Sequence, residues 1–279
     1  MPELPEVETI RQGLSQIFTG YTFLSGESFH RRIPKPGTIA PLSAVVGARI
    51  KSVNRRGKYL WFSLSDDLAL VAHLGMSGQF LADIKNGAEP NYVRARFVLK
   101  KGLKRRELIF NDVRAFGWLS LETLTNGLPT SALGIALDPF DSTFNRDAVI
   151  AMMKSRKAAI KSVLINQEIM SGVGNIYADE SLWHCRIHPE TPANSLGVKK
   201  LGELVDTATE MMREATKMGG TSFDPLYLNV YGEQGLFQNS LSVYGAEGEL
   251  CPRCVRKIKR IAFGNRSSHL CPKCQVKHS

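Results

Sequence analysis

Four cysteines near the C-terminus have the types and spacing of a zinc site. They occur as Cys251-Pro-Arg-Cys254 and, after sixteen residues, as Cys271-Pro-Lys-Cys274. Two such pairs direct four thiolates at one tetrahedral ion when a hairpin brings them together. From Cys251 onward the chain has eight lysines and arginines and no Asp or Glu. The spacing predicts one structural zinc, and the charge predicts nucleic acid as a partner rather than a purely structural ribbon with solvated lysines.

The N-terminal sequence Met1-Pro2-Glu3-Leu4-Pro5-Glu6 can carry covalent chemistry. If Met1 is removed, Pro2 becomes a free secondary amine, and α-amino groups titrate at a pH of about 8. Such an amine can attack a sugar C1′ or an aldehyde to form an iminium, which is an electron sink for later bond cleavages. The start of a helix disfavours the protonated amine, and Glu3 is close enough to transfer protons. The spacing alone favours an ordinary helix entry, in which Pro and Glu are common.

A glycine-rich segment between two helical patterns, Gly172-Val-Gly-Asn175-Ile-Tyr-Ala178, suits a phosphate contact. Glycines before a helix N-terminus expose backbone N–H groups, and Asn175 adds a neutral donor. Helix, turn and helix together form a helical hairpin that can rest on a DNA backbone without reading bases. A tight loop between packed helices is the alternative, and the motif alone leaves both open.

Two further glycine-flanked segments, residues 73–78 (HLGMSG) and 111–117 (NDVRAFG), contain side chains that can enter DNA. Met76 and Phe116 are apolar and can fill a gap in a base stack, while Arg114 can pair with an exposed base edge. By periodicity alone, a core Met and Phe beside a surface Arg is favoured.

Two single residues complete the candidates. Lys58, in Arg55-Arg-Gly-Lys58-Tyr59, stands at the start of a strand pattern beside two arginines and can bind a phosphate. A solvated basic turn is the alternative for Lys58. We interpret His73 as a buried histidine at the end of a strand.

The elements that must position these residues are of two kinds. Apolar residues at helical spacing predict a helix over residues 5–18. Alternating patterns between turns then predict the strands of a β-sandwich or barrel at residues 50–53, 59–64, 68–73, 93–99 and 107–110. Helical stripes follow at 149–153, 160–164 and 201–215, and Gly219-Gly220 ends the last of them. The segment 221–243 has no clear period and predicts a long, functional loop.

These patterns predict an α+β fold class with an N-terminal helix and β-sandwich domain at residues 1–130. The stretch 121–145 is rich in Thr, Pro, Asn, Gly and Asp, and we place a linker at its end, at 131–145. A helical DNA-binding domain follows at 146–245, and a zinc finger at 246–279.

Composition limits the class of protein. The chain has 279 residues, 43% of them hydrophobic, and a formal net charge of +10. It can bury a substantial core and is not a disordered basic tail. The charge fits DNA or RNA, and equally a membrane surface. The acidic N-terminus is unlike a signal peptide and no apolar stretch approaches membrane-spanning length. A lone Cys185 besides the zinc thiolates indicates a reducing cytoplasm, with Cys185 as a small buried apolar residue.

Together these motifs closely resemble the formamidopyrimidine-DNA glycosylase family, bacterial base-excision repair enzymes that act on oxidised purines. The resemblance extends nearly from end to end. Besides the four-cysteine finger, the matching motifs are P-E-L-P-E-V-E-T at 2–9, R-R-G-K-Y-L at 55–60, H-L-G-M-S-G at 73–78, N-D-x-R-x-F-G at 111–117, G-V-G-N-I-Y-A at 172–178 and V-Y-G at 243–245. The resemblance implies a helix-two-turn-helix arrangement in the helical domain.

The resemblance also implies a role for each candidate residue. Pro2, freed by loss of Met1, would attack C1′ of the damaged nucleotide, Glu3 would protonate the sugar ring oxygen, and Lys58 would contact the neighbouring phosphate and support proton transfer. Among the implied DNA contacts, Glu6 would hold the everted base, and Tyr244 with loop 221–243 would close over it. The gap that the base leaves would be filled by Met76, Arg114 and Phe116, with Arg114 facing the orphaned cytosine. The phosphates would be bound by Lys157, Asn175 and Arg266.

The chemistry that the resemblance implies is a glycosylase reaction followed by strand cleavage. The iminium acidifies the C2′ proton, so that β-elimination and then δ-elimination leave a one-nucleotide gap with phosphate ends. The base must be flipped because its target atom is unreachable in the stack. Neither a redox cofactor nor a catalytic metal is required, and the zinc positions Arg266. The partner is double-stranded DNA with oxidised bases or abasic sites, bound by a monomer in the bacterial cytoplasm, on the nucleoid.

The sequence departs from the family pattern at two places. Many relatives have Arg where this chain has Ala115, and the loss of that cation is expected to weaken a phosphate contact and relax the preference for the opposite base. Relatives also tend to carry His near 90–94, where this chain has Asn91-Tyr92-Val93-Arg94. Neither departure affects Pro2 or Glu3.

Two alternative functions remain open from the sequence. The endonuclease VIII branch shares Pro2 and Glu3 but prefers oxidised pyrimidines, and Leu4 together with the set of Met76, Arg114 and Phe116 disfavours it. A catalytically silent damaged-DNA-binding protein would bind kinked or abasic duplex without cleaving it, and would not need a nucleophile.

Overall fold

The computed structural model describes residues 2–31, 33–35, 38–65, 67–83, 90–222, 229–230 and 232–277. The chain divides into two compact units. The first unit comprises Met1–Gly134 and Gly219–Leu236, and the second comprises Ile135–Met218 and Phe237–Ser279. Residues 219–236, which the sequence places with the helical part, thus belong to the first unit. Within the described ranges no helix has the length and apolar character needed to cross a membrane.

The first unit begins with helix α1 (Leu4–Phe18), which confirms the helix predicted over residues 5–18. Pro5 stands in the first turn, where a missing N–H is tolerated. Val7, Ile10 and Leu14 recur at helical spacing and are buried. This apolar face fixes the helix against the sheets, and so fixes the position of the N-terminal residues.

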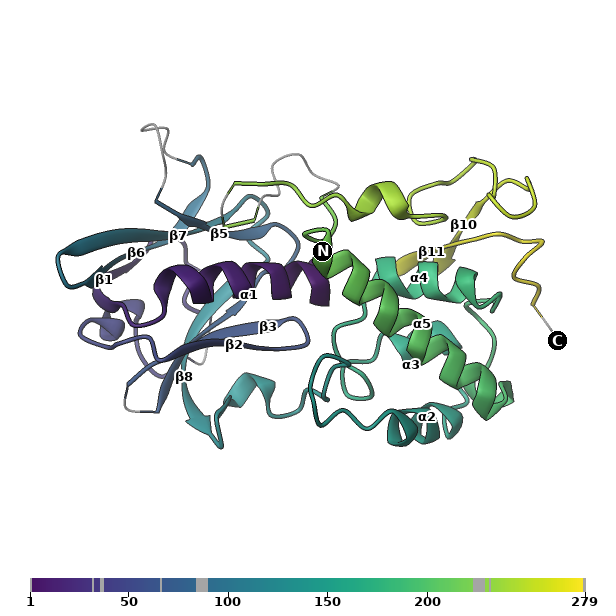
Figure 1. The fold of residues 1–279 in the computed structure, drawn as a ribbon, viewed down its shortest axis with the longest axis horizontal. Coiled ribbons are helices and arrows are strands. Elements are labelled where there is room, and N and C mark those ends of the chain that lie inside the picture. The colour runs from purple at the N-terminus through teal and green to yellow at the C-terminus, as the bar shows by residue number, and fades with distance from the viewer. Residues whose placement is uncertain are drawn as a thin grey trace. The chain divides into compact units, whose positions relative to one another are not determined.

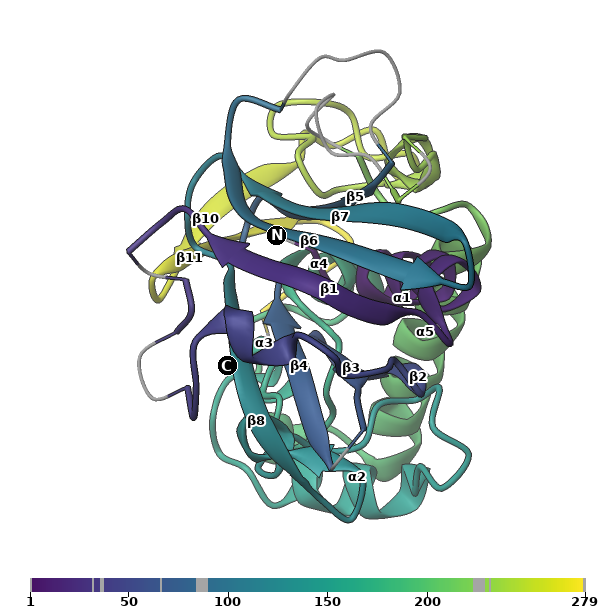
Figure 2. The same cartoon turned by 90° about the vertical axis from the view of Figure 1, so that its left-hand side faces the viewer.

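Two antiparallel sheets form the rest of the first unit within the described residues (Figures 1 and 2). One contains, in spatial order, β1 (Thr22–Ser28), β6 (Val93–Lys101), β7 (Lys104–Asp112) and β5 (Gly78–Ala82). The other contains β2 (Ser52–Arg56), β3 (Tyr59–Ser63), β4 (Leu68–His73), β8 (Trp118–Thr125) and β9 (Leu128–Pro129). The short helix η1 (Leu42–Val45) lies between β1 and β2, and the short helix η2 (Thr130–Ala132) follows β9.

The sandwich was predicted, but its strands were only partly located. β4 has the predicted bounds, β6 and β7 are longer than predicted, and β2 begins at Ser52 rather than at residue 50. The sequence gives no indication of β1, β5, β8 or β9. β1 contains Gly26, where a Cβ would lie 2.5 Å from the carbonyl oxygen of Leu42, so a close backbone approach interrupts its apolar pattern. β8 extends into the turn-rich stretch 121–145, because polar and apolar residues alternate there along a half-buried strand.

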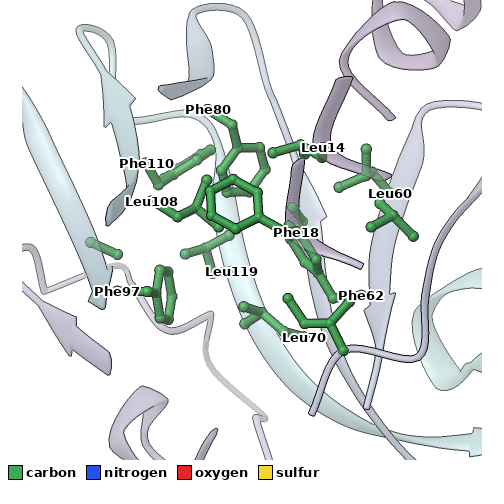
Figure 3. Close-up of a cluster of buried hydrophobic side chains, with 14 of the residues drawn as sticks. Leu14, Phe18, Leu60, Phe62, Leu70, Phe80, Phe97, Leu108, Phe110 and Leu119 are labelled. Atoms are coloured by element: carbon green, nitrogen blue, oxygen red, sulfur yellow. The ribbon is translucent and has the colours of Figure 1, made fainter. Parts of the chain in front are cut away.

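The core of the first unit lies between the two sheets (Figure 3). Leu14 and Phe18 of α1 meet Phe62 of one sheet and Phe80 and Phe110 of the other, and all are fully buried. Ring pairs cross this layer edge to face, with Phe62 and Phe80 centroids 5.8 Å apart. One continuous core therefore holds α1 and both sheets together.

The second unit is helical, as predicted, and ends in a β-hairpin. Its helices are α2 (Arg146–Lys154), α3 (Ile160–Leu164), α4 (Asn175–His184) and α5 (Val198–Lys217), with short η3 (Ala193–Ser195) and η4 (Phe237–Ser240). The Asn145 side chain caps α2 by accepting a hydrogen bond from the Ala148 N–H at 2.9 Å. α5 ends just before Gly219 and Gly220, whose φ angles are +78° and +81°. The hairpin pairs β10 (Lys259–Phe263) with β11 (Arg266–Leu270).

Candidate active site and nucleic-acid interface

The N-terminal residues are buried at the start of α1. Pro2 is buried, and Glu3 and Glu6 are 1% and 2% exposed. The backbone N–H of Glu3 donates to Oε2 of Glu6 at 2.8 Å, which satisfies a donor at the helix start. Met1 lies outside the described residues. An amine at position 2 would therefore stand in desolvated surroundings beside two carboxylates.

The Glu6 carboxylate also holds the segment that returns to the first unit. Its Oε1 accepts hydrogen bonds from the Thr221 N–H at 2.7 Å and from the Thr221 hydroxyl at 2.9 Å. A Cβ on Gly220 would lie 3.0 Å from the same oxygen, and its φ is +81°, so glycine is required there on two grounds. The start of loop 221–243 is thereby fixed to the first turn of α1, while its residues 223–228 and 231 lie outside the described residues.

Lys58 lies in the turn between β2 and β3 and is buried apart from a small fraction of its surface. Burial lowers the pKa of His73 to about 4, with further lowering from the charges of Lys58 and Lys35. His73 is therefore neutral at neutral pH. Its Nδ1 accepts a hydrogen bond from the Gly75 N–H at 3.1 Å, and its ring stacks on Trp118. The prediction of a histidine at a strand end is confirmed, although His73 is only partly buried.

Arg55, three residues before Lys58, serves the scaffold. Its Nε donates to Oε2 of Glu8 at 3.0 Å, and Arg11 donates to the same carboxylate. Burial raises the pKa of Glu8, but the bonds to Arg11 and the charge of Arg55 outweigh it and lower that pKa. This ion pair ties α1 to β2 next to the turn that carries Lys58.

Met76, Arg114 and Phe116 come together on the surface of the first unit. Met76 is 43% exposed and Phe116 is 56% exposed, so the core placement that periodicity favoured is wrong. The Arg114 guanidinium lies 3.9 Å from Sδ of Met76. A Cβ on Gly75 would lie 2.4 Å from the Phe116 carbonyl carbon, so the two loops are in direct backbone contact. Exposed apolar side chains around one cation suit a wedge in a base stack. We call Met76, Arg114 and Phe116 the wedge set.

Asp112 holds the wedge set, and sequence reasoning missed it. Its buried carboxylate accepts at Oδ1 from the Ser77 hydroxyl at 2.5 Å and from the Arg114 N–H at 3.2 Å. Its Oδ2 accepts from the Gly117 N–H at 2.7 Å. The bond from Asp112 to an N–H two residues later is the Asx-turn pattern, so an Asp just before the loop was the available signal.

Residues at the two departures from the expected pattern meet at one loop: Ala115 belongs to it, and Arg94 of β6 bonds to its start. Ala115 has φ of +53°, a left-handed conformation unusual for a residue with a Cβ. Arg94 Nε donates to the Asp112 carbonyl at 2.8 Å, and its guanidinium reaches the Val113 carbonyl at 3.4 Å. Arg94 thus supports the backbone of Asp112 and Val113, directly before Arg114 of the wedge set.

In the second unit, the candidate phosphate residues occupy chain turns and element ends. Asn175 is the first residue of α4 and follows the N-cap Gly174. Its amide oxygen is buried and accepts no hydrogen bond among the described residues. Lys157 is exposed between α2 and α3, and Arg266 is exposed at the first position of β11. A helix start and two exposed cations have the chemistry that an anion site requires.

Tyr244 belongs to a backbone turn that a single carboxylate, that of Glu180, holds through hydrogen bonds. Glu180, buried in α4, accepts from the N–H groups of Ser242, Val243 and Tyr244 at 2.9, 2.8 and 2.7 Å. Burial raises the pKa of Glu180, and the three N–H bonds oppose that rise. The Tyr244 ring meets His269 edge to face at 5.0 Å. The end of segment 221–243 is therefore anchored to α4 within the second unit.

The four cysteines fit one zinc ion. Their Sγ atoms all lie within 4.8 Å of one another, with 3.9 Å between Cys251 and Cys274 and 3.4 Å between Cys254 and Cys271. Zn–S bonds of about 2.3 Å in a tetrahedron place sulfurs about 3.8 Å apart, close to these separations. The zinc is structural, because four thiolates close its coordination shell. Cys185 lies apart from them, buried, and burial raises the pKa of its thiol.

Two side chains attach this zinc site to the helices. Arg253 stacks 3.7 Å over Trp183 and donates to the carbonyls of Trp183 and His184 at the end of α4. Gln275 accepts from the Cys271 N–H at 2.9 Å and donates to the Ile187 carbonyl at 2.8 Å. The cysteine end of the finger is thereby joined to the helical core.

Comparisons with known proteins agree with this geometry. Residues 1–119 match the formamidopyrimidine-DNA glycosylase N-terminal domain, 135–225 the H2TH domain of the same enzymes, and 248–276 the zinc finger found in FPG and IleRS. A formamidopyrimidine-DNA glycosylase from Nocardioides sp. is 45% identical over 278 residues, covering 99% of this chain and 94% of its own.

Two solved structures from Lactococcus lactis are also similar. A mutant FPG bound to Fapy-dG containing DNA is 33% identical with a TM-score of 0.86, and Fpg bound to abasic-site DNA is 31% identical with a TM-score of 0.84. Each match covers 99% of this chain and 100% of the other. The α+β fold, the helix-two-turn-helix domain and the zinc finger expected from the sequence are thus confirmed, and the chain belongs to the formamidopyrimidine-DNA glycosylase family.

Proposed function

We propose that this chain excises oxidised purines, including 8-oxoguanine and formamidopyrimidines, from duplex DNA and then cleaves the strand through a covalent intermediate on Pro2. The Lactococcus lactis relatives support the substrate class, since they were solved with Fapy-dG and abasic-site DNA. The observation that carries the catalytic assignment is the burial of Pro2 and Glu3 together at the start of α1.

The reaction begins once Met1 has been removed. The unprotonated Pro2 nitrogen attacks C1′, the C1′–N bond to the base breaks, and the base leaves with a proton. Glu3 protonates the ring oxygen, the sugar opens, and an iminium forms between C1′ and Pro2. Burial favours the neutral amine that this attack requires. Lys58, close to His73 and mostly buried, contacts the phosphate beside the lesion and assists proton transfer.

Strand cleavage follows from the iminium. Loss of a C2′ proton breaks the bond between C3′ and its phosphate oxygen, and a second elimination breaks the bond at C5′. Hydrolysis of the remaining iminium releases the sugar fragment as an aldehyde, frees Pro2 and completes the turnover. Both phosphates stay on the DNA ends, so a one-nucleotide gap remains. No oxidant or reductant enters this sequence.

Access to C1′ requires the damaged nucleotide to leave the duplex. The wedge set can take its place, because Met76 and Phe116 offer exposed apolar surface and Arg114 offers donors to the orphaned base. Glu6 contacts the everted base, and Tyr244 with loop 221–243 covers it. Lys157, Asn175 and Arg266 bind phosphates, while zinc holds the finger that carries Arg266. All these groups come from one chain, so a monomer suffices.

The wedge set also separates this proposal from the endonuclease VIII branch. Arg114, placed beside Met76, suits recognition of a cytosine opposite an oxidised purine. Excision rates on matched duplexes containing 8-oxoguanine or thymine glycol test the assignment. We expect faster excision of 8-oxoguanine, and a clear preference for thymine glycol would contradict it.

The nucleophile is tested by borohydride trapping on an 8-oxoguanine:cytosine duplex, with the N-terminal residue determined by mass spectrometry. Protein that begins at Pro2 is expected to form a covalent adduct, because borohydride reduces the iminium to a stable amine. Met1-retaining protein, in which the Pro2 nitrogen is a tertiary amide, is expected to form none, and Pro2→Gly, whose primary α-amine can still form an imine, is expected to form less. Binding without any adduct from correctly processed protein would instead identify a damaged-DNA-binding protein without catalysis.

A further inference from the structure

Lys161 of α3 and Asp179 of α4 form a buried ion pair in the second unit. The Nζ and Oδ1 atoms are 2.7 Å apart, and the two side chains are 0% and 1% exposed. Burying both charges is unfavourable unless their geometry is good and further polar groups satisfy them. The polar groups that bind Lys161 and Asp179 indicate the role of the ion pair.

Both partners bind the same strand of the finger hairpin. Lys161 Nζ donates to the Ser267 carbonyl at 2.8 Å and to the Ser268 hydroxyl at 2.6 Å. Asp179 Oδ2 accepts from the His269 N–H at 2.9 Å, and the His269 ring Nδ1 lies 3.2 Å from the same oxygen. Three consecutive residues of β11 are thus held by one ion pair of the helices, and α4 lies beside β11 (Figure 1).

The pair stands next to two of the proposed phosphate contacts. Arg266 directly precedes Ser267 on β11, and Asn175 lies one helical turn before Asp179 on α4. Lys161 Nζ also lies 5.3 Å from the ring centroid of Phe263, which pairs with Arg266 across the hairpin. By contrast, Arg253 and Gln275 hold the cysteine end of the finger. The half of the hairpin that carries Arg266 is fixed by the ion pair.

We propose that Lys161 and Asp179 are positioning residues that set Arg266 and Asn175 at a fixed spacing, so that both bind phosphates of one DNA strand together. The hydrogen bonds from the ion pair to β11 are directional, so they specify the register of β11 against α4. A purely apolar contact would let β11 slide along α4. Lys161 and Asp179 do not touch DNA themselves. This inference rests on the proposed phosphate contacts of Asn175 and Arg266.

The test is the salt dependence of binding to a duplex that contains a stable abasic-site analogue. The slope of log Kobs against log salt falls in magnitude by about 0.9 for each phosphate that the protein no longer binds. Asp179→Asn and the double variant Lys161→Met with Asp179→Leu are measured beside Arg266→Ala. The double variant replaces the charges by apolar groups and guards against simple misfolding, since buried pairs replaced in this way often leave proteins folded.

We expect Asp179→Asn and the double variant to lose affinity about tenfold and to lose about 0.9 from the slope, while one zinc per chain is retained. Combined with Arg266→Ala, either is expected to reduce the slope no further, because the same phosphate is already unbound. Trapping of the Pro2 adduct at saturating DNA is expected to remain.

Two control variants separate positioning from stability. Leu204→Ala truncates a fully buried residue of α5 and lowers stability while leaving the bonds of Lys161 and Asp179 to β11 in place. Asp206→Asn breaks the exposed ion pair between Arg146 and Asp206, which joins α2 to α5. Both are expected to keep the wild-type salt slope.

The inference would be overturned if both pair variants kept the wild-type slope and lost only as much affinity as Leu204→Ala does at the same melting temperature. The ion pair would then have a purely structural role. If Arg266→Ala keeps the full slope, or if Asn175→Ala, which removes a neutral donor, keeps the full affinity, the proposed phosphate contacts are wrong and the positioning role is rejected with them. Excision activity is measured separately, so failure of the glycosylase proposal is distinguishable from either result.

Discussion

The Glu6 carboxylate accepts two hydrogen bonds from Thr221, a residue 215 positions later in the chain. The same carboxylate accepts the Glu3 N–H through its other oxygen. One buried group therefore connects the residue next to Pro2 with the first residue of segment 221–243. Whatever moves that segment acts on the residues at the start of α1.

Replacing Glu6 by Gln tests this connection. An amide retains one acceptor oxygen but turns an NH₂ group toward backbone N–H donors, so we expect a loss of about 1–3 kcal/mol in unfolding free energy. Single-turnover excision is expected to slow as well. In a double-mutant cycle with Thr221→Val, the two effects are expected to be strongly non-additive. Strict additivity would show that the two side chains act independently.

Asp112→Ala is predicted to disorganise the wedge set. The substitution leaves the Gly117 N–H and the Ser77 hydroxyl without their buried acceptor, and leaves the Arg114 N–H with the Ser77 oxygen alone, at a cost of about 1–3 kcal/mol. We expect discrimination between cytosine and adenine opposite the lesion to fall, measured as the ratio of excision rates. Val113→Ala, on the same loop but exposed, serves as the control. An unchanged ratio in folded Asp112→Ala protein would refute the role of Asp112.

His73 predicts a specific loss of stability in acid. Its folded pKa of about 4 lies below the ordinary value of 6.5, so between these values the unfolded chain binds more protons. Stability from the neutral imidazole is therefore present above pH 6.5 and is lost as the pH falls toward 4. The total is at most about 3 kcal/mol. Urea unfolding gives the unfolding free energies of wild type and His73→Asn as a function of pH. The difference between the two is expected to change between pH 6.5 and pH 4, and a difference that stays constant would contradict the prediction.

Removal of the zinc should act on one unit only. Cys254→Ala is expected to release the metal and to weaken DNA binding about tenfold or more, because Arg266 is no longer held. Tryptophan fluorescence can follow the two units. Trp61 and Trp118 report on the first unit and Trp183 reports on the finger, since the two groups of tryptophans lie in separate apolar clusters. We expect only the second unit to lose its melting transition. Metal release with full affinity would exclude a role for the finger in binding.

Ala115→Arg is predicted to restore a missing phosphate contact. A new cation at this exposed loop should make the salt slope steeper by about 0.9. Ala115→Gln, similar in size but uncharged, should leave the slope unchanged. Equal slopes for the two variants would show that position 115 does not face a phosphate.

The sequence predicted best those features that depend on local spacing. The cysteine pairs needed only their intervals, and α1 needed only its apolar stripe. β1 was missed because Gly26 interrupts its apolar pattern, and β8 was missed because it extends into a stretch whose composition is typical of turns. Periodicity alone favoured Met76 and Phe116 in the core, because their exposure depends on the contact between Gly75 and Phe116, which no local pattern shows.

Features that join distant segments could not be derived from the sequence. Nothing near Glu6 indicates Thr221, and nothing near Lys161 indicates that its partners are Asp179 and three residues of the finger. Such residues belong to no recognisable sequence motif, and only the folded chain brings them together. The motif resemblance supplied the proposed catalytic residues, whereas the residues that position them came from the structure.

The discontinuity of the first unit has a consequence for biosynthesis. A ribosome releases the chain from its N-terminus, so Ile135–Met218 must be made before Gly219–Leu236 can return to the first unit. Until then the nascent N-terminal segment lacks Val230 from its core and Thr221 beside Glu6. A chain terminated early would thus carry Pro2, the proposed nucleophile, without its completed surroundings. Translation order itself delays assembly of the proposed catalytic centre until most of the protein exists.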